Sequence, residues 1–237
     1  MYQHNFPGNL PSADELPDSC EIAAHNELQE LIPGLLKATL LIVWAQRMDW
    51  FLGIDMGVYY HPDKPAIVPD AFLSLGVERC YHEDLRPSYV FWEDRVPSFV
   101  LEVTSSLYRK EFGDQFHHYE SLGILYYAIY ASLRLSKPRL EVHKLVNGKY
   151  KLQSENPVWM PEIGLGIGYE RGNYAGVTRE WVYWYDEEGN RYLTPEEQVK
   201  QESQRAQIAI QRAEQESQQS EKFAKKLREL GIDPNTL

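Results

Sequence analysis

Two acidic residues stand in apolar stretches of the chain, where a charge is costly to bury. Asp70 follows Pro69 within the run 67–73, and Glu102 interrupts the β-branched run 97–106. Each run has the composition of a buried strand. An ionised carboxylate in such a place needs a cation, a metal or a shared proton beside it. If the two strands are neighbours, the acids form a site for a hard cation such as Mg²⁺, which prefers oxygen ligands and is usually held by one or two carboxylates and water.

A helix is predicted directly after the Glu102 strand, over residues 107–121. Glu111, Gln115 and Tyr119 follow one another at intervals of four residues in it. Residues four apart share one face of a helix, so this face and the strand carboxylate could converge on one site.

A further acidic residue lies near the start of the chain. The first helix is expected to begin near Ser19, which suits the N-cap position. Glu21 and His25 then stand one turn apart and can face the same neighbour. Glu21 is therefore a candidate third carboxylate at the cation site, although a solvated pair of helices would explain the same pattern. Pro and Gly at 33–34 are expected to break or bend this helix, with a second apolar helix over 35–48.

The remainder of the globular part has the patterns of strands. They are predicted over residues 50–60, 66–77, 97–106, 124–133, 139–146, 149–153, 158–169 and 179–185. Asn147 and Gly148 predict a two-residue hairpin turn. Four aromatic residues near the end of this part, Trp181, Tyr183, Trp184 and Tyr185, indicate core packing, with a base-stacking platform as the alternative.

The composition changes at Thr194 to Gln, Glu, Ala, Ser and Lys. Thr194 as N-cap and Pro195 at the first position predict a long helix to about Leu230. Its residues at alternating intervals of four and three, from 206 to 227, are Ala, Ile, Ala, Ser, Ser, Ala and Leu, which is a weak seam for a coiled coil. A solvated single helix remains open, as does a helix that forms a homodimer or binds a partner.

Length, composition and charge limit the classes of protein. The 237 residues are 43% hydrophobic, enough for one domain (19–193) between an irregular segment (1–18) and the helical tail (194–237). The net charge of −11 argues against a broad DNA-coating surface, so any contact with nucleic acid needs a local basic patch or a metal.

No apolar run is long enough for a membrane span and no signal peptide is evident, which predicts a cytoplasmic protein without a membrane partner. Two cysteines without metal-ligand spacing indicate neither a disulfide framework nor a zinc site.

These residues together resemble a known family. Pro69-Asp70, the run 97–106 with Glu102, the helix with Tyr119 and the following segment 122–127 are similar to the Uma-two family, restriction-endonuclease-like proteins within the PD-(D/E)xK nuclease superfamily. The likeness covers roughly residues 19–185.

The resemblance implies an α/β fold with a restriction-endonuclease-like core, in which helices flank a mixed central β-sheet, followed here by the long C-terminal helix. It also implies a metal-dependent endonuclease that hydrolyses DNA phosphodiester bonds. Mg²⁺ or Mn²⁺ would be held by Asp70, Glu102 and Glu21. In such a site the metal activates water and stabilises charge on phosphate, while a Lys helps to position or deprotonate the water.

The chain departs from the family pattern at that Lys. The Lys expected after the Glu would be residue 104, which is Thr. The family often carries the Lys instead on the following helix, four residues before the Tyr, and that residue is Gln115. Gln can orient a water but neither carries positive charge nor accepts a proton near neutral pH. Lys110 is the nearby substitute. A catalytically weakened nuclease fold that binds nucleic acid or protein is therefore the alternative to an active endonuclease, and a structural protein that acts through its tail is the third hypothesis.

Overall fold

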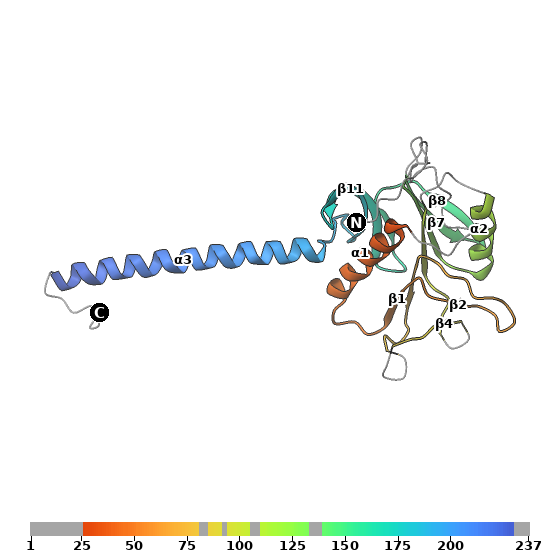
Figure 1. Ribbon diagram of the computed structural model, residues 1–237, viewed down its shortest axis with the longest axis horizontal. Helices are drawn as coiled ribbons and strands as arrows, with labels where there is room; N and C mark the ends of the chain where they lie inside the picture. The colour runs from red at the N-terminus through yellow and green to blue at the C-terminus, as the bar shows by residue number, and fades with distance from the viewer. Residues whose placement is uncertain (1–25, 81–84, 92–93, 105–109, 133–138, 230–237) are drawn as a thin grey trace, which may run out of the picture. The chain divides into compact units, whose positions relative to one another are not determined.

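The computed structural model describes residues 26–80, 85–91, 94–104, 110–132 and 139–229 (Figure 1). The chain divides between Tyr192 and Leu193 into two compact units. The helices of the first unit are α1 (Glu27–Val43) and α2 (Lys110–Leu122). Its strands are β1 (Trp50–Ile54), β2 (Val58–Tyr59), β3 (Ala71–Leu75), β4 (Tyr89–Val90), β5 (Phe99–Thr104), β6 (Tyr126–Ala131), β7 (Leu140–Val146), β8 (Lys149–Gln153), β9 (Val158–Met160), β10 (Leu165–Tyr174) and β11 (Val177–Tyr185).

A mixed six-stranded sheet forms the centre of the first unit, in the order β1-β3-β5-β6-β7-β8. Only β5 and β6 run parallel among its neighbouring strands, and α2 connects them, because a parallel pair needs a crossover connection. A three-stranded sheet (β11-β10-β9) and a short parallel pair (β2-β4) complete the strands. The predicted α/β architecture with a mixed central sheet and flanking helices is confirmed.

Both faces of the central sheet are covered. On one face, α1 packs with β11, β5 and β1 and joins the larger apolar core. On the other face, residues of α2, β2 and β4 form a second core with the sheet. All six residues of β5, Glu102 included, are consequently buried, as the composition of the run 97–106 predicted. A carboxylate on this strand is thus enclosed by protein.

The prediction of a break at residues 33–34 was wrong, since α1 continues through Pro33. Pro inside a helix costs about 3 kcal/mol. Four apolar side chains of α1, Ile32, Leu35, Leu36 and Leu40, are at most 1% exposed. Each contributes about 1.5–3 kcal/mol through burial, so packing against the sheet outweighs the cost of the proline. The predicted start at Ser19 is also displaced: α1 begins at Glu27 with Asn26 as its N-cap, and residues 19–25 lie outside the described part.

The strands predicted over 124–133, 139–146, 149–153 and 179–185 are confirmed as β6, β7, β8 and β11. The segment 158–169 instead forms two strands, β9 and β10, separated by a turn at 161–164. Asn147 and Gly148 both have positive φ, 54° and 75°, as the turn between β7 and β8 requires. The aromatic residues Trp181, Tyr183, Trp184 and Tyr185 are at most 5% exposed. They are core residues, so the alternative of a base-stacking platform is wrong.

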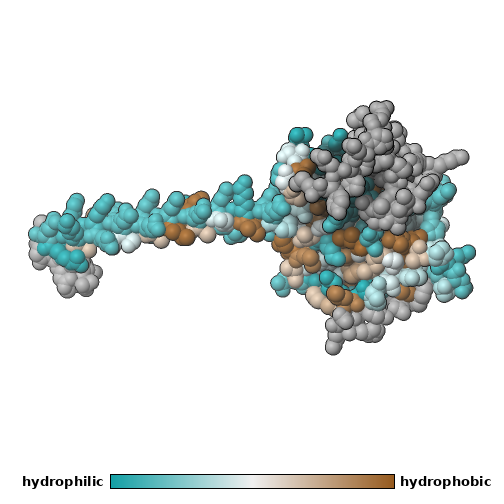
Figure 2. All heavy atoms as spheres, viewed as in Figure 1, coloured by the Kyte–Doolittle hydropathy of each residue, from teal (hydrophilic) through white to brown (hydrophobic). Residues whose placement is uncertain are grey.

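The second unit contains α3 (Pro195–Glu229), which begins as predicted. The Thr194 side chain accepts a hydrogen bond from the backbone N–H of Glu197, and the Glu197 side chain accepts one from the Thr194 backbone N–H. The surface of α3 is mostly hydrophilic (Figure 2). No described helix is both long and apolar enough to cross a membrane.

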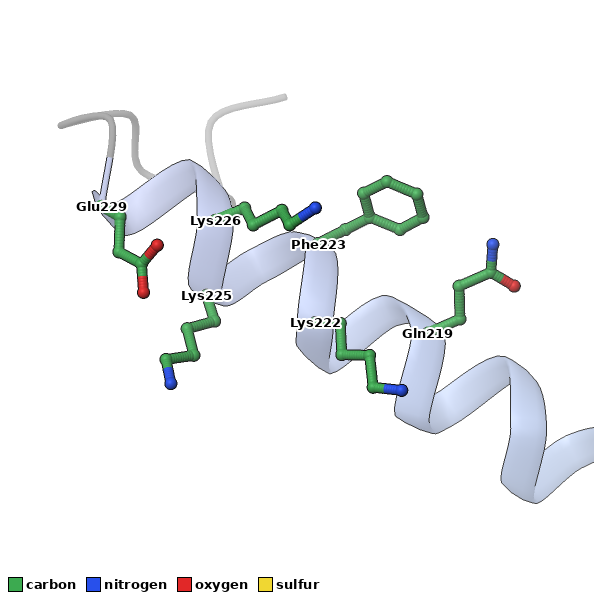
Figure 3. A pocket seen from close by; sticks show the side chains of 6 residues that line it. All are labelled: Gln219, Lys222, Phe223, Lys225, Lys226 and Glu229. Carbon is green, nitrogen blue, oxygen red and sulfur yellow. The ribbon is translucent and has the colours of Figure 1, made fainter.

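A hollow of about 390 Å³ lies beside the last turns of α3. Its described lining residues are Gln219, Lys222, Phe223, Lys225, Lys226 and Glu229. All six belong to one helix and project from it in different directions (Figure 3). A single helix cannot surround a ligand, so these residues describe an open surface rather than a binding site.

We expect deletion of residues 196–237 to leave the first unit folded. Among the side chains of 196–229 that the structure describes, none is buried, so the deletion removes little apolar packing. The melting temperature, followed by circular dichroism, should change by less than about 4 °C, the shift that 1 kcal/mol causes in a domain of this size. The particle mass measured by light scattering should fall by more than the mass of the deleted residues only if α3 forms a homodimer. Insoluble or non-cooperatively unfolding truncated protein would show that the tail supports the domain.

Candidate active site

Strand register brings Asp70 and Glu102 together. β3 and β5 are antiparallel, with Ala71 opposite Leu101 and Leu73 opposite Phe99. One step beyond these pairs, Asp70, the residue directly before β3, falls opposite Glu102. The side chains of Asp70 and Glu102 point to the same face of the sheet, because opposite residues of antiparallel strands do so. Asp70 is 5% exposed and Glu102 is 7% exposed, so both carboxyl groups are largely removed from water.

Asp70 is oriented by two donors from different elements. The backbone N–H of Val103 donates to Oδ2 at 2.6 Å, and Gln29 Nε2 donates to Oδ1 at 3.1 Å. Gln29 itself belongs to the capping box of α1, where its Oε1 accepts from the Asn26 backbone N–H at 2.9 Å. The first turn of α1 and strand β5 therefore fix the Asp70 carboxylate between them.

Glu102 is oriented by α2. The Tyr119 hydroxyl donates to Glu102 Oε1 at 2.6 Å, and Tyr119 is 2% exposed. Burial, followed by the charge of Glu102, raises the pKa of Tyr119 well above its ordinary value. The phenol thus stays protonated and remains a hydrogen-bond donor across the working pH range.

The two carboxyl groups influence each other's protonation. Burial, and next the charge of Asp70, raise the pKa of Glu102 from its ordinary value of 4.5 to about 8. Two neighbouring carboxylates that cannot both ionise share one proton. In the metal-free protein at neutral pH, the acid pair therefore carries about one negative charge, and a divalent cation would displace the shared proton.

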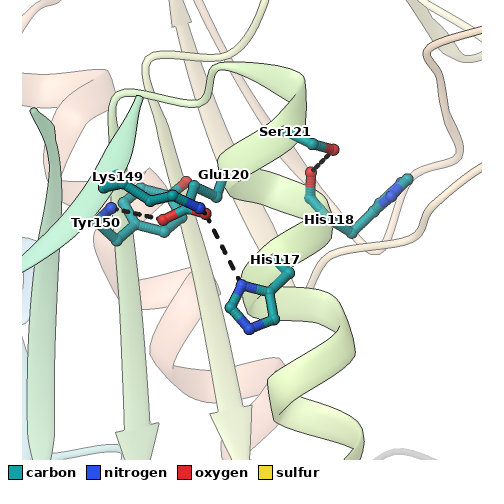
Figure 4. A network of polar contacts seen from close by, with 6 residues as sticks. All are labelled: His117, His118, Glu120, Ser121, Lys149 and Tyr150. Atoms are coloured by element: carbon teal, nitrogen blue, oxygen red, sulfur yellow. Dashed lines mark hydrogen bonds and ion pairs between the residues drawn. The ribbon is translucent and has the colours of Figure 1, made fainter. Parts of the chain in front are cut away.

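A second set of polar contacts holds α2 against the β7–β8 hairpin (Figure 4). Glu120 accepts hydrogen bonds from Lys149 Nζ at 2.7 Å and from the Tyr150 backbone N–H at 2.8 Å. The hydrogen bond from Lys149 lowers the pKa of Glu120, with a further lowering from Tyr150. Because Tyr119 is the preceding residue, this anchor at Glu120 helps to fix the helix that supports Glu102.

The other predicted site residues lie on β5, on α2 or before the described part of the chain. Gln115 lies on α2, one turn before Tyr119, and is exposed. Thr104 is the last residue of β5 and is 7% exposed. Lys110 begins α2, and its side chain, like that of Glu111, is outside the described part. Glu21 and His25 precede the described residues, so their expected place beside the acid pair remains a prediction.

Sequence reasoning missed Gln29. The available signal was its position three residues after Asn26, which is the spacing of a capping box. That spacing predicts the contact within α1 but says nothing of the long-range contact with Asp70.

We expect Glu102→Gln to change how stability depends on pH. The pKa of Glu102 is raised in the folded state, so between pH 4.5 and about 8 the folded protein holds a proton that the unfolded chain releases. The free energy of unfolding of the metal-free wild type should consequently fall as pH rises through this window. Gln is neutral throughout, so the variant should gain over the wild type with rising pH. Each kcal/mol would appear as about 2–4 °C in melting temperature.

This expectation is checked by thermal unfolding in EDTA at intervals from pH 5 to pH 8.5. Mg²⁺ added at pH 8 should raise the melting temperature of the wild type more than that of Glu102→Gln. Parallel pH profiles for the two proteins would show that Glu102 does not carry the shared proton.

A mixed sheet with a buried pair of acids on adjacent strands, and a helix between parallel strands that supports one of them, defines a restriction-endonuclease-like α/β protein. Residues 21–171 match the model of the Uma2 family, described as "Putative restriction endonuclease". The chain therefore belongs to this family, which confirms the resemblance seen in the sequence.

The chain is also similar to a solved structure. A solved structure, "Crystal structure of a putative nuclease belonging to DUF820" from Anabaena variabilis ATCC 29413, is similar with a TM-score of 0.41 and 11% identity, over 58% of this chain and 73% of that one. No curated protein matches the chain.

Proposed function

We propose that the protein is a metal-dependent endonuclease that hydrolyses DNA phosphodiester bonds. The observation that carries this proposal is the buried pair of Asp70 and Glu102, opposite each other on adjacent strands, with the pKa of Glu102 raised by burial and by Asp70. Membership of the restriction-endonuclease-like family supports the same reaction class.

The chemistry of this donor set fits a divalent cation such as Mg²⁺ or Mn²⁺. Two carboxylates facing each other supply oxygen ligands, and their mutual repulsion is relieved when a cation binds. Among the residues that the structure describes, no three His, Cys, Asp or Glu side chains gather into one cluster. Two carboxylates with water suffice for Mg²⁺. Asp70 and Glu102 would therefore hold the metal, with Glu21 as the proposed third ligand.

A bound metal of this kind would supply a more acidic water and charge stabilisation on the phosphate. The chain's own residues contribute orientation. Tyr119 holds one oxygen of Glu102, while Gln29 and the Val103 N–H hold Asp70. Gln115, exposed one turn before Tyr119, is the proposed group that orients the attacking water, because its amide both donates and accepts hydrogen bonds.

A nuclease fold that binds nucleic acid or a protein without cleaving is the second candidate. Thr104 and Gln115 favour it, because neither residue at the two expected lysine positions carries a positive charge. The two candidates share the fold and the acid pair, and they differ in turnover.

A cleavage assay separates them. Purified protein is incubated with supercoiled plasmid and with single-stranded DNA, in EDTA, in Mg²⁺ and in Mn²⁺. Nicked, linear or fragmented products that need the metal support the endonuclease. Retention of DNA without products favours the binding module, and neither binding nor cleavage contradicts both.

We expect Tyr119→Phe to lower the rate of metal-dependent cleavage by about 10–100-fold, the usual cost of removing a group that orients a metal ligand. The variant keeps the ring packing of Tyr119 against Tyr127 and removes only the hydrogen bond to Glu102. Metal affinity is measured by calorimetry beside the rate. Tyr126→Phe, which removes a hydroxyl bonded to Glu162 in a separate contact, is the matched control and should leave cleavage unchanged. Equal rates for Tyr119→Phe and the wild type would show that Glu102 needs no such support.

A further inference from the structure

A nuclease with a net charge of −11 needs a local basic surface to approach DNA. Such a surface occurs where the β10–β11 hairpin meets the end of β6 and the start of β7. Its members are Arg139, Arg171 and Arg179, which are called the arginine cluster below. Each neighbours Glu180, Arg139 by a long ion pair, Arg171 by strand register and Arg179 along the chain.

Arg179 is held in place by neutral partners. Its Nε donates to the Glu180 backbone carbonyl at 3.2 Å, and an Nη donates to the Tyr130 hydroxyl at 3.4 Å. The guanidinium lies 5.6 Å from the centre of the Trp181 ring. These contacts fix the side chain without cancelling its charge, and several N–H groups remain for an anion.

The other two arginines flank the same carboxylate. Arg139 Nη1 lies 3.9 Å from Glu180 Oε2, at the outer limit of an ion pair, with 31% of its side chain exposed. Arg171 stands opposite Glu180 in the register of β10 and β11 and is exposed. The cluster therefore combines three cations with one anion.

The acid that precedes Arg171 does not remove this excess. Glu170, the residue before Arg171, is paired with Arg191, whose Nε lies 2.5 Å from its Oε1. In the described part of the chain, neither Arg171 nor Arg179 makes an ion pair with a carboxylate. A net charge of about +2 thus stays on a small area of an acidic protein, from the count of three arginines and Glu180.

The cluster lies at the same end of the sheet as the acid pair but on the opposite face. Tyr130 packs in the core on the α1 side, whereas Ile129, the partner of Glu102, packs in the core on the α2 side. Tyr130, which contacts Arg179, is the parallel-strand partner of Val103, the residue that donates to Asp70. Ala131 donates its backbone N–H to the Arg139 carbonyl at 2.7 Å, and Ala131 is the partner of Thr104 at the end of β5. The backbone of Arg139 is therefore two strand spacings from the backbone of Thr104, which is about 10 Å.

We propose that the arginine cluster binds backbone phosphates of the DNA on the β6–β7 side of the bond that is cleaved. This inference rests on the proposed nuclease function and adds the surface that holds the substrate. Guanidinium groups bind phosphate through paired N–H donors, and phosphate contacts position a duplex without reading its sequence. The expected binding is accordingly independent of DNA sequence and sensitive to salt.

The test measures binding apart from cleavage. Fluorescence anisotropy of a labelled duplex is recorded in EDTA at several KCl concentrations for the full chain, the Arg139→Gln/Arg171→Gln double variant and Glu180→Gln. Removing one arginine that binds a phosphate lowers the slope of log K against log salt by about 1, so the slope of the double variant should be smaller by about 2. Glu180→Gln removes the only carboxylate of the cluster and should tighten binding.

Two controls keep the outcomes distinct. The Arg205→Gln/Arg212→Gln double variant removes the same two charges from the exposed surface of α3 and should leave binding as in the wild type. Mg²⁺ affinity, measured by calorimetry, should be the same in all variants. If the wild type binds DNA and the Arg139→Gln/Arg171→Gln variant shows the same salt slope, the arginine cluster does not bind phosphate. The nuclease proposal is unaffected by that result. Absence of both DNA binding and cleavage in the wild type contradicts the nuclease proposal itself.

Discussion

Asp70→Asn and Glu102→Gln should each reduce metal-dependent DNA cleavage by at least about 10²–10³-fold. Either change replaces a charged oxygen ligand by a weak neutral one at the proposed metal site. Charge stabilisation by a bound metal is worth several kcal/mol, and each 1.4 kcal/mol is about a tenfold change in rate. The rate is measured as conversion of supercoiled plasmid in Mg²⁺ and in Mn²⁺, and calorimetry should show weaker metal binding in both variants.

Both substitutions keep the shape of the side chain, so loss of activity should not reflect unfolding. Asn at position 70 retains an oxygen that can accept from Val103 N–H or from Gln29. Glu30→Gln is the matched control, because Glu30 is an exposed carboxylate in the turn of α1 that also carries Gln29. Cleavage at the wild-type rate by Asp70→Asn, with melting temperatures unchanged, would remove the acid pair from the mechanism.

The elements that carry the acid pair could be predicted because local pattern and burial agree there. β5 is an apolar run enclosed on both faces, and its composition alone indicates a strand with a carboxylate that needs a partner. The helix after it follows from residue spacing. A connection of that length is compatible with the parallel pairing of β5 and β6 that the structure shows. The opposition of Asp70 and Glu102 was conditional on neighbouring strands, which the register of β3 and β5 supplies.

Features that depend on distant parts of the chain could not be predicted in the same way. α1 passes through Pro33 because its apolar face packs on a sheet formed by later residues, and this packing outweighs a local rule. Gln29 meets Asp70 across 41 positions of sequence, and Tyr130 meets Arg179 across 49. Such contacts follow from the arrangement of strands, which propensity and periodicity do not specify.

Gln115→Lys should raise metal-dependent cleavage above the wild-type rate. Residues four apart lie on one face of a helix, so position 115 shares the face of Tyr119, whose hydroxyl contacts Glu102. An ammonium there would add a positive charge near the scissile phosphate and a donor for the attacking water. Groups that position or transfer protons contribute about 10²–10⁴-fold, and the exposed position of Gln115 allows the longer side chain without disturbing the core.

The cleavage rate of Gln115→Lys is compared with that of the same variant carrying Glu102→Ala. Cleavage by Gln115→Lys should disappear on adding Glu102→Ala, which removes a proposed metal ligand. Asp114→Lys, at the adjacent exposed position of α2, adds a lysine on a different face and should not raise the rate. If Gln115→Lys binds metal yet cleaves no faster than its Glu102→Ala counterpart, this site lacks more than a lysine. The acid pair would then serve a protein that binds DNA or a partner without turnover.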